Sequence, residues 1–150
     1  MYFELSNILL HTCARCQGNG FSNDWILDSG ASMHFKNSIK DYIDFYPLDE
    51  PIKVSTAKKG VHTLILGVGT VLVHHDLERR SVVTKLDKVW YIPDLHLKLL
   101  SIWEILKCGH IIHGSQGRII SLNKKDAPIM VYWPHAVDQN IYWLFCRPIQ

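Results

Sequence analysis

Trp25-Ile26-Leu27-Asp28-Ser29-Gly30-Ala31-Ser32 is the stretch that decides the fold. Its three consecutive large apolar residues indicate a buried strand, which delivers the Asp28 carboxylate into a tight turn. Gly30 permits an unusual backbone angle and a close approach by another segment. An isolated Asp-Ser-Gly is typical of ordinary surface turns. The apolar run before it instead predicts a half-buried carboxylate at the end of a strand.

The rest of the chain indicates an all-β fold. From residue 24 onward, short apolar runs alternate with turn signals about every ten residues, as in barrels and sandwiches. Strands are expected at 25–27, 52–56, 62–66, 69–74, 80–84, 88–92, 110–113, 118–122, 128–131 and 141–145. One short helix is predicted near residues 102–108, because Ser101 and Glu104 form a capping-box pattern and Gly109 can provide a left-handed C-terminal cap.

Length and composition allow one domain with a leader. The sequence has 150 residues, with 16 Lys+Arg against 14 Asp+Glu. We expect a loose leader at 1–23, the domain at 24–146 and a tail at 147–150. The nearly balanced charge and the absence of basic runs with interleaved aromatics argue against nucleic-acid binding.

Neither a membrane nor a secretory setting is expected. The longest nearly apolar stretch, 64–73, is far shorter than the ~20 residues that span a bilayer. No positive charge precedes the apolar residues 8–10, as a secretory signal would require. The four cysteines are too unevenly spaced for a disulfide framework, which favours a reduced intracellular, cytoplasmic setting.

Beyond these local signals, the chain resembles the protease segment of copia-type retrotransposon Gag-Pol polyproteins, also described as a transposon Pol β-barrel domain. The family pattern, apolar-Leu-Asp-Ser-Gly-Ala-Ser-x-His, stands here at residues 26–34. The similarity covers roughly 24–146. It continues in order through Gly67-Val68-Gly69-Thr70-Val71, Val89-Trp90-Tyr91-Ile92-Pro93-Asp94-Leu95, Leu99-Leu100-Ser101-Ile102, Lys107-Cys108-Gly109 and Ile141-Tyr142-Trp143-Leu144.

The resemblance implies a retropepsin-like single-lobe β-barrel and a set of site residues. Asp28 would be the catalytic aspartate. Ser29 would brace the paired catalytic loops through its hydroxyl, and Gly30 would let those loops meet. Residues 99–101 would pack beneath the catalytic loop. The candidate flap over an extended peptide is formed by Lys58, Lys59 and Gly60.

This chemistry requires a second copy of the chain. Aspartic proteolysis uses two carboxylates ~3 Å apart that share one proton, one acting as base on water and the other as acid. The sequence has no internal repeat and supplies one such aspartate, so a symmetric homodimer would supply the second. The expected function is an aspartic endopeptidase that cleaves a Gag-Pol-like polypeptide, without a cofactor. In an active element it would work in the virus-like particle.

A different class of function stays open. The 150 residues contain no integrase or reverse-transcriptase sequence. The alternative is therefore a catalytically inactive transposon-derived β-barrel remnant or a domesticated binding module.

The remaining motifs are weaker. His11, Cys13 and Cys16 suggest zinc, but a retroviral-type knuckle would need His where Phe21 stands and a further Cys. We expect no metal site, although a small zinc-dependent adaptor stays a third hypothesis. His34 fits the family pattern, and we expect a structural ring satisfied by a backbone carbonyl rather than a catalytic one.

Two further patterns do not match known binding motifs. Gly67-Val68-Gly69 is no dinucleotide fingerprint, because Leu72 replaces the third glycine. The adjacent His74 and His75 should lie on opposite faces of a strand, which does not suit a shared metal.

Overall fold

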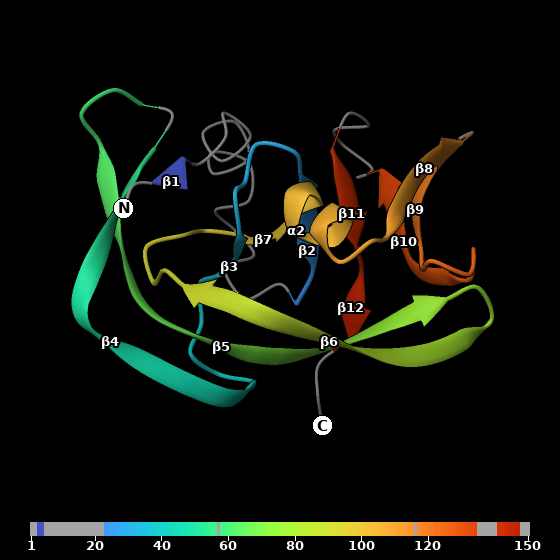
Figure 1. The fold of residues 1–150 in the computed structure, drawn as a ribbon, viewed down its shortest axis with the longest axis horizontal. Coiled ribbons are helices and arrows are strands. Elements are labelled where there is room, and N and C mark those ends of the chain that lie inside the picture. The colour runs from blue at the N-terminus through green and yellow to red at the C-terminus, as the bar shows by residue number, and fades with distance from the viewer. Residues whose placement is uncertain (1–2, 5–22, 57, 116, 135–140, 148–150) are drawn as a thin grey trace.

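The computed structural model describes residues 3–4, 23–56, 58–115, 117–134 and 141–147. These residues form an all-β fold with one short helix, which confirms the predicted fold class (Figure 1). The elements are β1 Phe3–Glu4, β2 Trp25–Asp28, β3 His34–Lys36, β4 Tyr42–Ser55, β5 His62–Leu77, β6 Arg80–Tyr91, β7 Lys98–Ser101, α2 Ile102–Lys107, β8 Ile111–Ser115, β9 Arg118–Leu122, β10 Pro128–Pro134, β11 Tyr142–Leu144 and β12 Cys146–Arg147. In this part of the chain, no helix has the length and apolar character needed to cross a bilayer.

The strands follow one path, in the order β1-β4-β5-β6-β3-β7-β2-β11-β10-β9-β8. The long antiparallel strands β4, β5 and β6 sweep across one side, and β3, β7, β2 and β11 stand above them (Figure 1). In the middle of the path, β2 pairs with β7 in parallel and with β11 antiparallel. The candidate catalytic strand is therefore central in the sheet.

The sheet is not closed into the β-barrel that the resemblance implies. Closure would require β1 to meet β8, but these strands are the two ends of the path. Among the described residues, β12 lies off this path and pairs with His74 and His75 of β5. Two paired positions join β10 to β11, and Ile120 and Val131 of β9 and β10 pack with Leu77 of β5.

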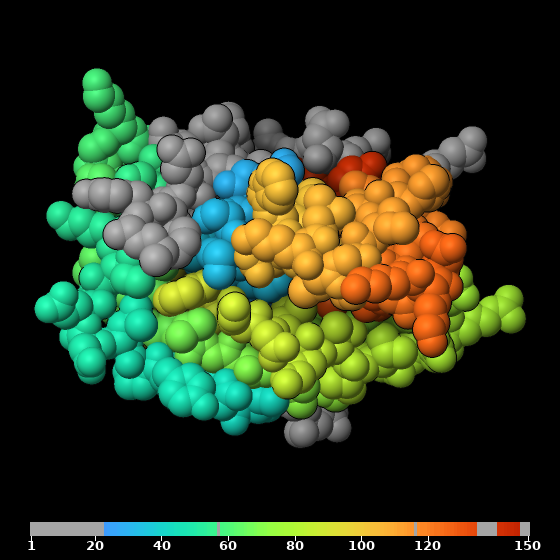
Figure 2. Space-filling model, in the orientation of Figure 1, coloured from blue at the N-terminus to red at the C-terminus, as the bar shows by residue number. Residues whose placement is uncertain are grey.

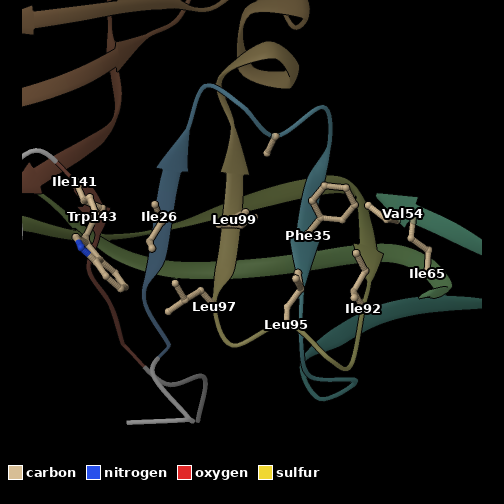
Figure 3. Packing of buried hydrophobic residues seen from close by; sticks show 11 residues of the cluster. Ile26, Phe35, Val54, Ile65, Ile92, Leu95, Leu97, Leu99, Ile141 and Trp143 are labelled. Atoms are coloured by element: carbon tan, nitrogen blue, oxygen red, sulfur yellow. The ribbon is translucent and has the colours of Figure 1, made fainter. Parts of the chain in front are cut away.

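The core explains why β2 is apolar without interruption. Ile26 packs in one buried cluster with Phe35 and Leu99 (Figure 3), whereas Trp25 and Leu27 pack in a second cluster on the other face. A strand covered on both faces carries a continuous apolar run rather than an alternating one. Burial of both faces therefore fixes the position of Asp28 at the strand end.

The helix begins as the sequence predicts. The Ser101 Oγ accepts the Glu104 N–H at 3.2 Å, and Gly109 has a φ of 82° after the last turn. The second hydrogen bond of the predicted capping box, from the Ser101 N–H to the Glu104 side chain, does not form. The Ser101 N–H donates to His34 Nδ1 at 3.0 Å instead. The Glu104 carboxylate instead pairs with Lys107 Nζ at 3.1 Å.

Two glycines that look like turn signals lie inside β5. A Cβ on Gly67 would lie 2.2 Å from the Phe45 ring, and one on Gly69 would lie 2.1 Å from the Asp44 carbonyl oxygen. Because these two residues have no side chain, β4 can pack closely against β5 at these positions. They do not interrupt the strand, so the strands predicted at 62–66 and 69–74 are one continuous strand. The strands predicted at 80–84 and 88–92 likewise merge into β6.

Candidate active site

Asp28 is the last residue of β2, as the sequence predicts. It lies opposite Ser101 in the parallel β2–β7 pair, whose preceding positions join Ile26 to Leu99 and Leu27 to Leu100. Ile26 and Leu27 are buried, and Asp28 itself has no exposed surface, although only half-burial is expected from sequence. Residues 99–101 thus lie beside the strand that carries Asp28, directly before α2.

The Asp28 carboxylate closes its own turn. Its Oδ1 accepts the Gly30 N–H at 2.8 Å, the geometry of an Asx-turn. Ser29 and Gly30 are exposed, so the turn presents its backbone at the surface. The described glycines with positive φ are Gly60, Gly109 and Gly117. The unusual angle expected at Gly30 is therefore not a left-handed one.

Ser101 connects this turn to the helix. Its Oγ donates to the Ala31 carbonyl at 2.7 Å while accepting the Glu104 N–H. Because Ser101 and Ala31 are both completely buried, the hydrogen bond fixes the end of the Asp28 turn against the start of α2. The sequence predicts the cap but gives no sign of the bond to Ala31.

His34 has a structural role that the sequence predicts only in outline. Its Nδ1 accepts the Ser101 N–H, so it satisfies a backbone amide rather than the expected carbonyl. The neutral ring must therefore carry its proton on Nε2. Burial lowers the pKa of His34 from 6.5 to about 4, although the nearby Glu104 carboxylate acts in the opposite direction.

The candidate flap is a hairpin tip between β4 and β5. The Thr56 N–H donates to the Val61 carbonyl at 3.0 Å, and the Val61 N–H donates to the Lys58 carbonyl at 3.1 Å. Lys58, Lys59 and Gly60 are exposed, and the φ of 79° at Gly60 suits only glycine well. These residues form the tip of an exposed hairpin, and their role as a flap over a peptide stays a prediction.

A buried lysine is a feature that the sequence gives no sign of. Lys36 is 1% exposed, and its Nζ donates to the carbonyls of Ser38 (3.0 Å) and Lys40 and lies 4.9 Å from the centre of the Tyr42 ring. Burial, and then the charge of Lys98, lower the pKa of Lys36 to about 8. This lysine packs under the β3–β4 connection, where its hydrogen bonds give it a structural role.

The histidines and cysteines considered as metal ligands lie in two segments of the chain. Within them, no group of three or more His, Cys, Asp or Glu side chains could hold an ion. His11, Cys13 and Cys16 lie outside the described residues. His74 and His75 are on opposite faces as predicted, since His74 is half-buried while the buried His75 Nε2 lies 2.7 Å from Thr84 Oγ1.

The comparison with known families covers this site. Residues 25–110 match the family described as Pol polyprotein, beta-barrel domain, which is more than half of the chain. The matched segment includes the Asp28 turn, the β4–β5 hairpin, Ser101 and α2. A search of curated proteins finds no match.

Proposed function

Since the chain belongs to the family of Pol polyprotein β-barrel domains, we propose that it is the aspartic endopeptidase of a copia-type retrotransposon Gag-Pol polyprotein. The observation that carries the proposal is the placement of Asp28. It ends a central buried strand, beside a second parallel strand that leads directly into a helix. A carboxylate held in this way has a fixed position, as catalysis by proton transfer requires.

The proposed active form is a symmetric homodimer. Each protomer would contribute one Asp28, so that one carboxylate takes a proton from water while its protonated partner donates to the substrate carbonyl oxygen. Two like charges ~3 Å apart cannot both ionise, and the pair therefore shares a proton. The exposed Ser29–Gly30 backbone supports this arrangement, because it leaves the turn accessible to another copy.

The proposed substrate is an extended polypeptide. A peptide strand would lie across the paired turns, with the Lys58–Gly60 hairpin of each protomer folding over it. Backbone groups of an extended peptide supply affinity, and pockets for alternate side chains supply specificity. Proton transfer between carboxylates and water needs no cofactor.

One observation favours a second candidate, a non-catalytic binding domain. Asp28 is completely buried in the single chain, and its Oδ1 is used by the Gly30 amide. An aspartate with a purely structural role in a turn makes the same bond. In that case the domain would have kept the fold of the family and lost the chemistry.

Cleavage of a peptide from a Gag-Pol junction separates the two candidates. We expect cleavage by the wild type, a loss of at least a thousandfold in Asp28→Asn, and no change in Asp49→Asn, which alters an exposed aspartate on β4. Asn keeps the size and the acceptor oxygen but cannot exchange the proton. Equal cleavage by wild type and Asp28→Asn would exclude this mechanism. A confirmed wild-type dimer without cleavage would count against the protease and favour the non-catalytic domain.

A further inference from the structure

A cavity of about 410 Å³ lies between β6, α2 and the β9–β10 hairpin, and Asp28 is not among its lining residues. In Figure 2, α2 and the segment that follows it (orange) lie directly against β6 (yellow-green) on the face toward the viewer. The volume falls in the range of small-molecule pockets, roughly 300–1,000 Å³. The cavity is therefore large enough for a ligand with several rings.

The wall is mainly apolar, with a polar floor. Leu86, Ile105 and Met130 are buried side chains that line it. At the floor, the OH of the fully buried Tyr132 lies 3.2 Å from the buried Ser121 Oγ. The apolar wall suits a hydrocarbon or aromatic body, and the hydroxyls of the floor already satisfy each other.

His34 places one hydrogen-bond donor in this wall. The ring is 6% exposed and lines the cavity. Because Nδ1 accepts the Ser101 N–H, the ring nitrogen left for the cavity is the protonated Nε2. Among the described residues, no hydrogen-bond acceptor is found for Nε2. A ligand oxygen would supply one.

At the rim of the cavity, one lysine has no ion-pair partner among the residues that the structure describes. Lys85 Nζ lies 3.4 Å from the Asp87 carboxylate, and Lys107 pairs with Glu104. Within the described residues, Lys88 has no such partner. Lys88 has a φ of 53° and lies in a β-bulge of β6. The bulge falls between Val89, which pairs with Gly69 of β5, and Leu86, which pairs with Val71.

We propose that this cavity binds a small amphipathic molecule with an apolar, preferably aromatic, body and one anionic group. The body would fill the space between Leu86, Ile105 and Met130. The anion would lie near Lys88 at the rim, and an oxygen of the ligand would accept the His34 Nε2–H. This site does not depend on the proposed protease activity, because it uses neither Asp28 nor the hairpin of residues 58–60.

Titration with 8-anilinonaphthalene-1-sulfonate, an aromatic sulfonate, tests the proposal by fluorescence. The wild type should bind one equivalent with saturation. Ile129→Trp, which fills the cavity from its half-buried wall, should weaken binding at least tenfold. Lys88→Asn should weaken it about threefold, the scale of one exposed ionic contact. Ile111→Trp and Lys125→Asn, exposed positions outside the cavity, should change affinity less than twofold.

The methyl resonance of Met130 gives a second readout on the unaltered chain. It should shift on addition of the probe with the same saturation curve as the fluorescence. This measurement decides the question if Ile129→Trp does not fold. The proposal is overturned if the wild type binds no probe, if folded Ile129→Trp binds as tightly as the wild type, or if Met130 does not respond.

Discussion

Acidification should destabilise this protein because the buried His34 ring stays neutral in the fold but takes up a proton in the unfolded chain. The effect should fall in the pH range between the two pKa values of this ring. The pKa of His34 is 6.5 in an unfolded chain and about 4 in the fold, where burial disfavours the charged form. Between these values the unfolded state binds more protons, so stability falls as the pH drops below 6.5. Within this range, each pH unit of acidification lowers the free energy of unfolding by about 1.4 kcal/mol. The loss from this ring should reach about 2 kcal/mol at pH 5 and be complete below pH 4.

Urea unfolding of matched variants isolates this contribution. In His34→Asn the amide oxygen can take the place of Nδ1 and accept the Ser101 N–H, but the side chain does not titrate. The stability difference between wild type and His34→Asn should therefore change by about 2 kcal/mol from pH 7.5 to pH 5, in favour of the variant at acidic pH. Changes in other groups cancel in this difference. His113→Asn, at an exposed histidine of β8, is the control.

A difference that stays constant between pH 7.5 and pH 5 would refute the reasoning. So would a nuclear magnetic resonance titration of the folded wild type in which the His34 ring becomes protonated near pH 6.5. Either result would mean that the ring is not held neutral by burial. The protease assay proposed above should accordingly be run at mildly acidic pH, and not below about pH 5, to keep the chain folded.

Three further predictions test the site and the sheet. If the active form is a dimer, cleavage by Asp28 pairs should rise with the square of the protein concentration while monomer predominates, and a strictly linear dependence would contradict the dimer. Ser101→Ala should lower the free energy of unfolding by about 1–3 kcal/mol, because it removes the helix cap and the bond to the Ala31 carbonyl; an unchanged urea midpoint would count against that role. Gly69→Ala should cost about 1–3 kcal/mol, since the Asp44 backbone cannot yield to a new Cβ, and a neutral effect in the same measurement would show that β4 can move.

What the sequence predicts well is local. The run Trp25–Leu27 ends at Asp28 as expected, and Ser101 begins the helix as expected, because each signal depends on residues within a few positions. The all-β class follows from the same kind of evidence. Short-range patterns thus locate the candidate aspartate without knowledge of the sheet order.

What the sequence does not predict depends on distant partners. The amide of Ser101 is satisfied by His34 rather than by Glu104, since the ring approaches from another strand. Gly67 and Gly69 look like breaks until the packing of β4 against them is known. The open sheet, likewise, depends on the order in which distant strands pair, which no local pattern contains.

The central position of β2 also governs when the candidate site can form. Trp25 and Ile26 pair with Leu144 and Trp143 on one side, and with Lys98 and Leu99 on the other. During synthesis from the N-terminus, β2 cannot form its pairs until β7 and β11 have been synthesised, much later in the chain. Contacts this far apart in sequence also form slowly, because the intervening chain must close first. A nascent chain that stops before β11 would thus carry the aspartate without the complete framework that positions it.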